Sequence, residues 1–392
     1  MSPPSVPNVL NVLMVSDVYF PRVNGVSTSI ETFRQTLAQE GVNIRLVAPR
    51  YNGEPPDELG IVRIPGKPAP GSPEDRLPRW RLLAQAVRRE AARADVIHIQ
   101  TPFAAHYAGL QAARALKRPV LATYHTLFEE YFQHYARVAP ASFLRGIARS
   151  VSKSQCNALD AVVVPSSAMR ERLRDYGVTT DLHVVPTGIP LARFSSGDRA
   201  RFRAQHGIAE DRPVALYVGR VAHEKNLNFL IDAFARAVAK RSNLLLLVTG
   251  EGPALEDLRA RVAALGLNEN VRFLGYLDRR TELPDCYAAA DAFVFASLTE
   301  TQGLVLLEAM AQGLPVIGLA AMGTKDILAP NLGCMTPLAE LDSFAEAIVR
   351  LMKEPDLRTR LSAEAREYAT RWSDRALAAR LAGLYRTMHD GP

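Results

Sequence analysis

Cysteine is scarce in this chain, and its few copies form no pattern typical of a disulfide framework or a zinc site. Cys156, Cys286 and Cys334 are far apart, with no CxxC pair and no clustered histidine. We expect all three to be small buried residues. No apolar run approaches the roughly 18 to 20 residues of a membrane-spanning helix. The N-terminus has no basic segment before its apolar stretch, so a signal peptide is not indicated and we expect a cytoplasmic protein.

Charge is unevenly divided along the chain. Residues 1–195 hold 23 Lys and Arg against 16 Asp and Glu, whereas the remainder holds 24 against 25. A basic first half predicts contact with an anionic surface, either a membrane or a nucleic acid. Aromatic residues make up only 7% of the chain, and no patch interleaves them with basic residues as single-strand binding favours. We therefore favour a membrane surface and expect no nucleic acid partner.

The fold class follows from apolar strand-like runs that alternate with amphipathic helical stretches. This alternation is typical of an α/β protein with parallel sheets and helices on both faces. The runs are rich in Val, Ile and Leu, as expected for strands buried on both sides. The predicted strands of the first half are 9–17, 43–49, 95–100, 119–125, 161–166 and 183–188.

The strand series restarts after residue 210, which predicts a second domain of the same class. Its expected strands are 213–220, 244–252, 271–277, 291–297 and 315–320. A chain of 392 residues also exceeds the size at which a single core stops growing, about 250 to 300 residues. We place the hinge near residue 190 and interpret the polar stretch 189–212 as a linker that leads into a short helix. The domains are then 1–190 and 191–372, and the helical segment 373–392 is expected to cross back to the first.

The segment from Glu300 to Glu308 directly follows a predicted strand and runs into a helix that Gly313 and Pro315 end. Glu300 should lie in the loop and Glu308 inside the helix. The amides of Gly303 and Leu304 at the helix start would be free donors in a favourable dipole, a common way to hold a diphosphate. The alternative is that Glu300 is an ordinary first-turn carboxylate and that Glu308 lies on a solvated face.

A second cluster, YVGRVAHEKN at 217–226, begins where another predicted strand ends at Gly219. Arg220 and Lys225 would lie at that strand end, and two cations there could neutralise a nucleoside diphosphate. Fixed cations would also stabilise the charge that develops on a departing diphosphate. The alternative is a surface ion pair among Arg220, Glu224 and Lys225.

Two further candidates come from the first half. Asn24 and Gly25 form a loop after the first strand, where backbone amides could approach a phosphate or a sugar, although the loop has neither GxGxxG nor a P-loop lysine. His125 ends another strand and could hydrogen-bond a sugar hydroxyl or exchange protons. The alternatives are an ordinary turn and a structural histidine. His98, inside a predicted strand, should belong to the core.

Residues 144–153 form a basic amphipathic helix in which Arg145, Arg149 and Lys153 recur every four residues. Such a helix can lie on anionic lipid, and the stretch 76–90 adds more arginine and Trp80. The alternative is an ordinary surface helix of the first domain.

Taken together, these segments resemble family 4 of the retaining glycosyltransferases, which have the GT-B fold of two Rossmann-like domains facing across a cleft. The resemblance spans nearly the whole chain. It rests on five segments in the family's order: PRVNGVSTS, GRVAHEKN, GEGP at 250–253, VRFLGYL at 271–277 and ETQGLVLLEAMAQGLPVI, which contains the Glu-x7-Glu pattern.

The resemblance implies a role for each candidate residue. Arg220 and Lys225 would bind the donor diphosphate with help from the amides of Gly303 and Leu304, and Glu300 would contact hydroxyls of the transferred sugar. Glu308 would hold the ribose, and backbone near Tyr276 and Leu277 would contact the base. Gly25 would lie near the phosphate, and His125 would lie beside the donor sugar. Gly219, at the end of its strand, is also assigned to donor binding.

The first-loop motif departs from many members of the family, which have Gly-Gly where this chain has Asn24-Gly25. Since Asn tolerates positive φ better than most residues, we expect the loop to survive the change. Asn-Gly-Val and YHTLFEEYFQHY, which contains Glu129, Glu130 and His134, are similar to the subgroup that acts on lipids such as diacylglycerol.

The resemblance therefore implies a retaining hexosyltransferase that uses a UDP- or GDP-sugar and acts on a lipid or glycan at the inner face of the membrane. No metal or other cofactor is expected, because the chain lacks a DxD-like carboxylate pair. Retention through front-face attack would leave Glu300 as a binding residue. Two alternatives remain: a sugar-nucleotide epimerase of the same fold, and a non-catalytic membrane- or glycan-binding protein.

Overall fold

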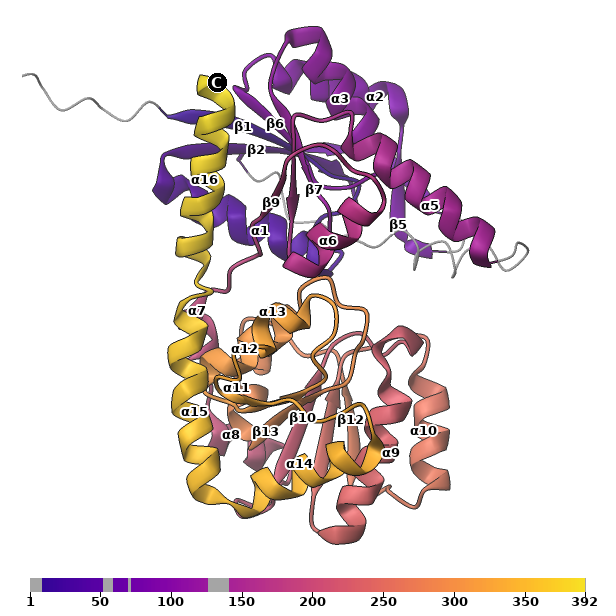
Figure 1. Cartoon of the computed structure of the whole chain (residues 1–392), viewed down its shortest axis with the longest axis vertical. Coiled ribbons are helices and arrows are strands. Elements are labelled where there is room, and N and C mark those ends of the chain that lie inside the picture. Colours follow the sequence, from indigo (N-terminus) through magenta and orange to yellow (C-terminus); the bar gives the residue numbers. More distant parts are fainter. Residues whose placement is uncertain (1–8, 52–58, 70–71, 126–140, 392) are drawn as a thin grey trace, which may run out of the picture. The chain divides into compact units, whose positions relative to one another are not determined.

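The computed structural model describes residues 9–51, 59–69, 72–125 and 141–391 of the chain (Figure 1). It divides into two compact units. The first unit comprises Met1–Gly188 together with Asp374–Pro392, and the second comprises Ile189–Ser373. Each unit has its own sheet, helices and core.

The first unit is built on a parallel sheet with the strand order β3-β2-β1-β6-β7-β8-β9. All six predicted strands are present, each within or close to its expected range. β3 was not predicted, because it has only four residues and one of them is Arg63, whereas the other strands of four residues or fewer in this sheet contain no Arg, Lys, Asp or Glu. The strands are β1 (Leu10–Val15), β2 (Val42–Pro49), β3 (Ile61–Ile64), β6 (Val96–Ile99), β7 (Val120–Thr123), β8 (Ala161–Val164) and β9 (Leu182–Val184).

Helices cover both faces of this sheet, because side chains alternate between the faces along each strand. Leu10, Val12 and Met14 of β1 pack in one core with α1 (Gly25–Leu37) and the C-terminal helix α16 (Asp374–Asp390). Two other helices, α2 (Trp80–Ala91) and α3 (Ala104–Leu116), pack against each other and against β1. The unit also contains α5 (Ala141–Cys156), α6 (Ser167–Asp175) and η1 (Ala38–Glu40).

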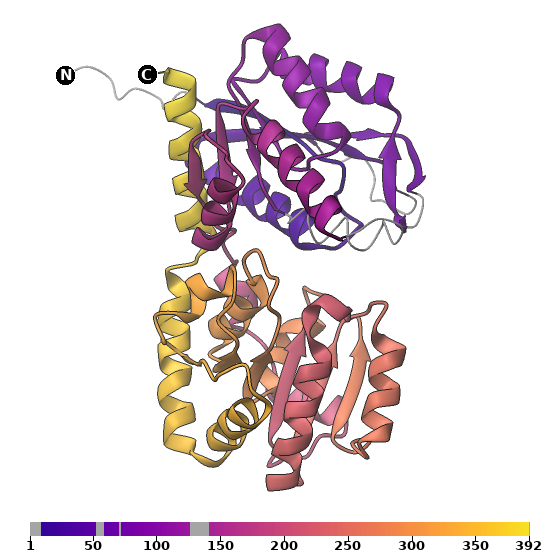
Figure 2. The same ribbon diagram turned by 45° about the vertical axis from the view of Figure 1, so that its right-hand side comes forward.

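A two-stranded antiparallel ribbon lies outside this sheet and was not predicted (Figure 2). Its strands are β4 (Gly66–Ala69) and β5 (Ser72–Pro78). Proline and charged residues interrupt both strands, so neither carries the apolar run from which buried strands are predicted. The ribbon leads directly into α2.

The second unit repeats the architecture with the strand order β12-β11-β10-β13-β14-β15, again all parallel. The five predicted strands are present, and only the two-residue β15 was missed. The strands are β10 (Val214–Val218), β11 (Leu245–Thr249), β12 (Val271–Gly275), β13 (Ala292–Phe295), β14 (Val316–Gly318) and β15 (Cys334–Met335). The helices are α7 (Leu191–Phe194), α8 (Arg199–Gln205), η2 (His223–Lys225), α9 (Leu227–Lys240), α10 (Leu255–Ala264), α11 (Glu282–Ala289), α12 (Leu304–Gln312), α13 (Thr324–Leu328), α14 (Leu341–Lys353) and α15 (Pro355–Thr370).

The stretch 189–212, which we interpreted as a linker, packs into the second unit. Phe194 and Phe202 are buried in its core, and the Arg203 side chain is fully buried. The Arg203 guanidinium donates to the carbonyls of Ala289 and Ala209 and pairs with Asp291 at 3.1 Å. The polar residues of this stretch made it look like a linker. One of them, Arg203, is buried, and its hydrogen bonds go to backbone carbonyls instead of water.

The C-terminal helix α16 is tied to the first sheet by a buried hydrogen-bond chain. Tyr385 of α16 lies 2.6 Å from Nδ1 of His98, and Nε2 of His98 lies 2.7 Å from the hydroxyl of Thr123. His98 is only 1% exposed, in agreement with the core position expected for it. Burial lowers the pKa of His98 to about 3, so the ring is neutral in the folded protein.

This buried histidine predicts acid sensitivity of the fold. Its folded pKa lies below the ordinary value of 6.5, so protons bind the unfolded chain first as the pH falls. Stability from His98 is therefore present above pH 6.5 and is lost below it, by about 2 kcal/mol between pH 7 and pH 5. His98→Gln should be less stable at pH 7 but should lose correspondingly less on acidification. Urea unfolding at both pH values measures this, with exposed His389→Gln as the control; an unchanged pH dependence in His98→Gln would contradict it.

Candidate active site

The loop after β10 carries the first two predicted donor-site residues. Arg220 follows Gly219 and is exposed, and its carbonyl accepts a 3.1 Å hydrogen bond from the buried Tyr217 hydroxyl. The next turn, η2, contains Lys225 and ends at Asn226, which has left-handed backbone (φ 55°). The side-chain amide of Asn226 donates to the carbonyl of Ala296 at 3.1 Å. This bond attaches the lysine-bearing turn to the loop that follows β13.

A close backbone approach supports the same loop. The amide of Gly219 donates to Thr249 at the end of β11, and that of Val221 donates to Glu251. A Cβ atom on Gly250 would lie 1.9 Å from the Gly219 carbonyl oxygen, a contact no side chain could make. The glycines of GEGP are therefore needed for this packing.

Lys225 and Glu300 meet in space although 75 residues separate them. Lys225 Nζ lies 2.7 Å from Glu300 Oε1, and both side chains are about four-fifths buried (20% and 18% exposed). Glu300 lies in the loop between β13 and α12, as expected. The surface pair considered as an alternative is present only as a 3.8 Å contact between Arg220 and Glu224.

Helix α12 begins with an open cap beside this pair. Gly303 is its N-cap in left-handed conformation (φ 96°), and no side chain caps the helix there. Leu304 is the first helical residue. The first amides of an α-helix have no partner within the helix, so this end offers donors to an anion together with the positive end of the helix dipole.

Glu308 faces the interior of the second unit, so the alternative that it lies on a solvated face is wrong. Its side chain is 2% exposed. One carboxylate oxygen pairs with Arg279, and the other accepts a 2.9 Å hydrogen bond from Tyr287. Neither partner was predicted, because Arg279 lies in a loop and Tyr287 in α11, with no spacing that links either of them to α12.

The predicted base-contacting residues lie in the loop that joins β12 to α11. Tyr276 is exposed, whereas Leu277 is buried. Arg279 follows two residues later. The loop therefore places the positions assigned to the base and the partner of Glu308 on one short segment.

In the first unit, Asn24 and Gly25 start α1 in a way that differs from our expectation. Asn24 has extended backbone (φ −157°) and not positive φ, and its side-chain oxygen caps α1 by accepting from Ser27 at 2.8 Å. The departure from Gly-Gly is thus explained by helix capping, at which Asn excels. Gly25 is the first helical residue, and the space around its Cβ position is open.

His125 lies just after the carboxyl end of β7, where one polar residue from the end of the neighbouring strand β6 contacts it. Its Nε2 is 3.0 Å from Gln100 Oε1, at the end of β6, and burial lowers its pKa to about 4. Asp17, after β1, accepts from Thr101 and from the amide of Ala105, yet burial raises its pKa to about 6. Asp17 and Gln100 were not predicted as site residues; only adjacency of β1, β6 and β7 brings them to the same edge.

Other expectations concern residues outside the candidate site positions described above. All three cysteines are buried, as expected. No group of potential metal ligands occurs in the parts of the chain that the structure describes. Glu129, Glu130 and His134 lie outside the described residues, as does the side chain of Arg145.

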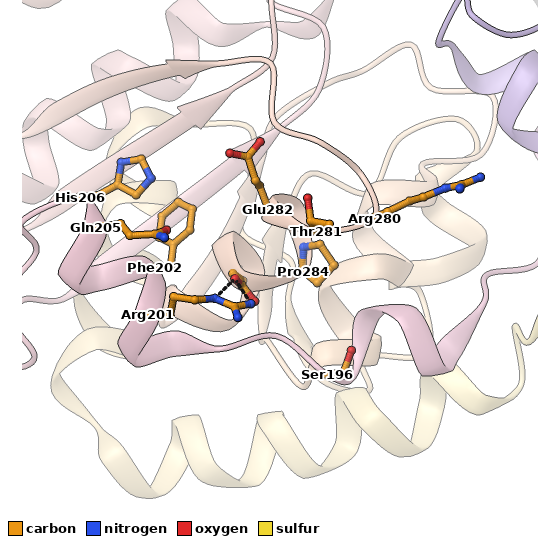
Figure 3. Close-up of a pocket in the computed structure, with 10 residues that line it drawn as sticks. Ser196, Arg201, Phe202, Gln205, His206, Arg280, Thr281, Glu282 and Pro284 are labelled. Atoms are coloured by element: carbon orange, nitrogen blue, oxygen red, sulfur yellow. Dashed lines mark hydrogen bonds and ion pairs between the residues drawn. The ribbon is translucent and has the colours of Figure 1, made fainter. Parts of the chain in front are cut away.

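A cavity of about 440 Å³ lies between α8 and the start of α11, and none of the predicted site residues lines it (Figure 3). Arg201 in its wall is paired with Asp285 at 2.5 Å, and the ring of Phe202 stacks on His206. Arg201 and Asp285 therefore already partner each other in this wall.

Sequence comparison relates the chain to enzymes that transfer sugars. Residues 198–368 match the family described as Glycosyl transferases group 1, and residues 23–193 match Glycosyltransferase Family 4. The alpha-monoglucosyldiacylglycerol synthase of Streptococcus pneumoniae is 31% identical over 89% of this chain and 80% of that protein. A GDP-mannose-dependent alpha-mannosyltransferase of Mycolicibacterium smegmatis is 28% identical over 96% of this chain and 94% of that protein.

Solved structures confirm the GT-B fold class. Sucrose-phosphate synthase from Thermosynechococcus elongatus superposes with a TM-score of 0.78 at 24% identity, covering 96% of this chain and 98% of that chain. The HepE protein of Anabaena, solved in complex with UDP-glucose, gives 0.75 at 18% identity, with 96% and 99% covered. With two family matches in chain order and a relative above 30% identity along most of its length, this chain belongs to the family 4, group 1 glycosyltransferases.

Proposed function

We propose that this glycosyltransferase moves a hexose from a UDP- or GDP-sugar to a hydroxyl group of a membrane lipid, with retention of the anomeric configuration and without a metal. The observation that carries the proposal is the Lys225–Glu300 pair beside the open start of α12. A cation and free helix amides suit a diphosphate, and a carboxylate beside them suits the hydroxyls of the attached sugar.

In this site the diphosphate is bound by Lys225, Arg220 and the amides of Gly303 and Leu304. When the donor enters, its phosphates compete with Glu300 for Lys225, which frees carboxylate lone pairs for sugar hydroxyls. Positive charge at the leaving diphosphate stabilises the transition state. Because Lys225 is held by Asn226 and the β13 loop, this charge is placed before the donor arrives.

Glu308 is assigned to the ribose, and the backbone near Tyr276 and Leu277 to the base. His125 is assigned to the donor sugar. Because its pKa is lowered to about 4, His125 is neutral at pH 7. With its Nε2–H directed to Gln100 Oε1, its Nδ1 can accept a hydrogen bond from a sugar hydroxyl without adding charge. Gly25, with open space at its Cβ position, is assigned to the phosphate side of the donor.

The acceptor proposal rests on similarity and on surface chemistry. The pneumococcal relative is named for diacylglycerol, and the sulfoquinovosyl transferase of Arabidopsis thaliana is 27% identical over 94% of this chain and 72% of that protein. In the first unit, Leu77, Trp80 and Leu82 are exposed apolar residues. They lie at the end of β5 and in α2, among arginines. We propose that these residues contribute to peripheral binding at the inner face of the membrane. No helix in the described part of the chain has the length and apolar character to cross a membrane.

The reaction is tested by supplying UDP-glucose, UDP-galactose and GDP-mannose, each with diacylglycerol or a total lipid extract. We expect one donor to yield a glycolipid with the α-configuration of the donor, read by NMR coupling of the anomeric proton. EDTA should leave the rate unchanged, because protein cations neutralise the diphosphate. A β-linked product or abolition by EDTA would contradict retention or metal independence, respectively. Conversion of the donor sugar without acceptor would instead indicate an epimerase.

The site assignment is tested by Lys225→Ala and Glu300→Ala. Each variant should lower kcat/KM by about 100- to 1,000-fold, because each removes a charge that contacts the donor where the bond breaks. Lys240→Ala and Glu346→Ala are matched controls, since these residues form an exposed ion pair of the same type at 3.3 Å in the same unit. Near-normal activity of a folded Lys225→Ala or Glu300→Ala protein would refute the assignment.

Membrane binding is tested with Arg149→Gln/Lys153→Gln, two cations on the exposed side of α5. Each cation near an anionic surface contributes about 1 kcal/mol, so the double variant should bind phosphatidylglycerol vesicles about 30-fold more weakly. Arg236→Gln/Lys240→Gln removes the same charge at the same spacing from α9 of the second unit and serves as the control. Equal losses in the two variants, measured by vesicle co-sedimentation, would contradict a specific role for α5.

A further inference from the structure

The buried carboxylate of Glu308 has two partners that the similarity to known enzymes did not suggest. We infer that Arg279 is a positioning residue for the nucleotide: it holds Glu308 in the orientation that accepts hydrogen bonds from the ribose, and it attaches the base-contacting loop to α12. This inference rests on the proposed donor site in the second unit. It assigns Arg279 no contact with the reacting sugar.

The carboxylate of Glu308 is deeply buried. At 2% exposure Glu308 has almost no access to water, and a buried carboxylate stays ionised only if a cation and hydrogen bonds compensate its desolvation. Arg279 supplies the cation at Oε1, and Tyr287 supplies a hydrogen bond at Oε2. Burial and the neighbouring Glu308 raise the pKa of Tyr287 well above 10, so its hydroxyl keeps the proton that it donates.

The Glu308 carboxylate can accept more hydrogen bonds than these two partners donate. An ionised carboxylate has two oxygens with about four lone-pair sites in all. Arg279 takes one site on Oε1, and Tyr287 takes one on Oε2. A lone pair on each oxygen remains for the vicinal hydroxyls of a ribose. Two fixed partners thus set the plane of the carboxylate without saturating it.

Arg279 also lies close in the chain to the residues assigned to the base. It lies two residues after Leu277, in the loop assigned to the base. The loop is shaped locally by Asp278, whose Oδ1 accepts from the amides of Arg280 and Thr281 and from the Thr281 hydroxyl, each at 2.9 Å. The Arg279–Glu308 pair then joins this preshaped loop to α12. One ion pair therefore couples the segment that meets the base to the carboxylate that meets the ribose.

The loop offers a matched control. Arg280 is the next residue and has the same charge, but it is exposed, and its side chain extends away from the rest of the cavity lining (Figure 3). Its backbone bond to Asp278 does not depend on its side chain. Arg280→Gln and Arg279→Gln therefore make the same change in charge at adjacent positions.

The test measures binding of UDP and GDP, and of the 2′-deoxy form of whichever binds, by titration calorimetry. For the wild-type protein and Arg280→Gln we expect the ribose form to bind at least tenfold more tightly than the deoxy form, because a hydrogen bond to a charged acceptor is lost. Arg279→Gln should bind the ribose form at least tenfold more weakly, and its preference over the deoxy form should fall below threefold. The KM for the donor should rise in proportion, with kcat changed less than threefold.

The outcomes separate the possible roles. A loss shared equally by ribose and deoxy forms would show that Arg279 only maintains the loop and would overturn the inference, as would unchanged binding by Arg279→Gln. If neither UDP nor GDP binds the wild-type protein, the proposed donor site itself fails. Should Arg279→Gln not fold, Arg279→Lys keeps the charge but not the fork of donors: it should show a ribose preference between those of wild type and unity, and an unchanged preference would overturn the inference.

Discussion

In both units the strands of the main sheet run parallel, so their carboxyl ends come to the same edge. In the second unit, the loops that leave this edge carry Arg220 and Lys225 after β10, Arg279 after β12 and Glu300 after β13. Helix α12, which also begins there, carries Glu308. Helices that begin there direct their positive ends toward the same region. The parallel topology thus assembles a site for an anion from segments that are far apart in the sequence.

Two ion pairs organise this edge of the second unit, and their burial differs. Lys225 and Glu300 retain about a fifth of their exposure, so a charged ligand can reach them and exchange partners with them. Glu308 is sealed from water and held by Arg279 and Tyr287, so it is a fixed acceptor. In the proposed donor site, the Lys225–Glu300 pair meets the part of the donor that changes charge during the reaction, and Glu308 meets the nucleoside, which leaves unchanged.

In the first unit, residues that are far apart in the chain depend on each other. Tyr385 in α16 reaches His98 in β6, and the same histidine touches Thr123, two residues before His125. The neutral imidazole of His98 bonds through both nitrogens, which anchors α16 to the sheet beside a candidate site residue. The buried contacts that dock the last helix therefore reach to within two residues, along the chain, of the candidate site residue His125.

The sequence by itself determined the fold class and most strands, because buried parallel strands are continuous apolar runs. It also located the strand-end segments that carry Lys225 and Glu300 and the helix that carries Glu308. β3 is short and contains Arg63, and β4 and β5 contain proline, so none of them has a continuous apolar run. The polar residues of 189–212, which include the buried Arg203, led to the interpretation of a packed segment as a linker. Only the tertiary structure decided which charges pair. Arg279 and Tyr287 reach Glu308 from the loop after β12 and from α11, and Gln100 at the end of β6 contacts His125. Such contacts depend on strand order and side-chain direction, which local spacing in a sequence does not encode.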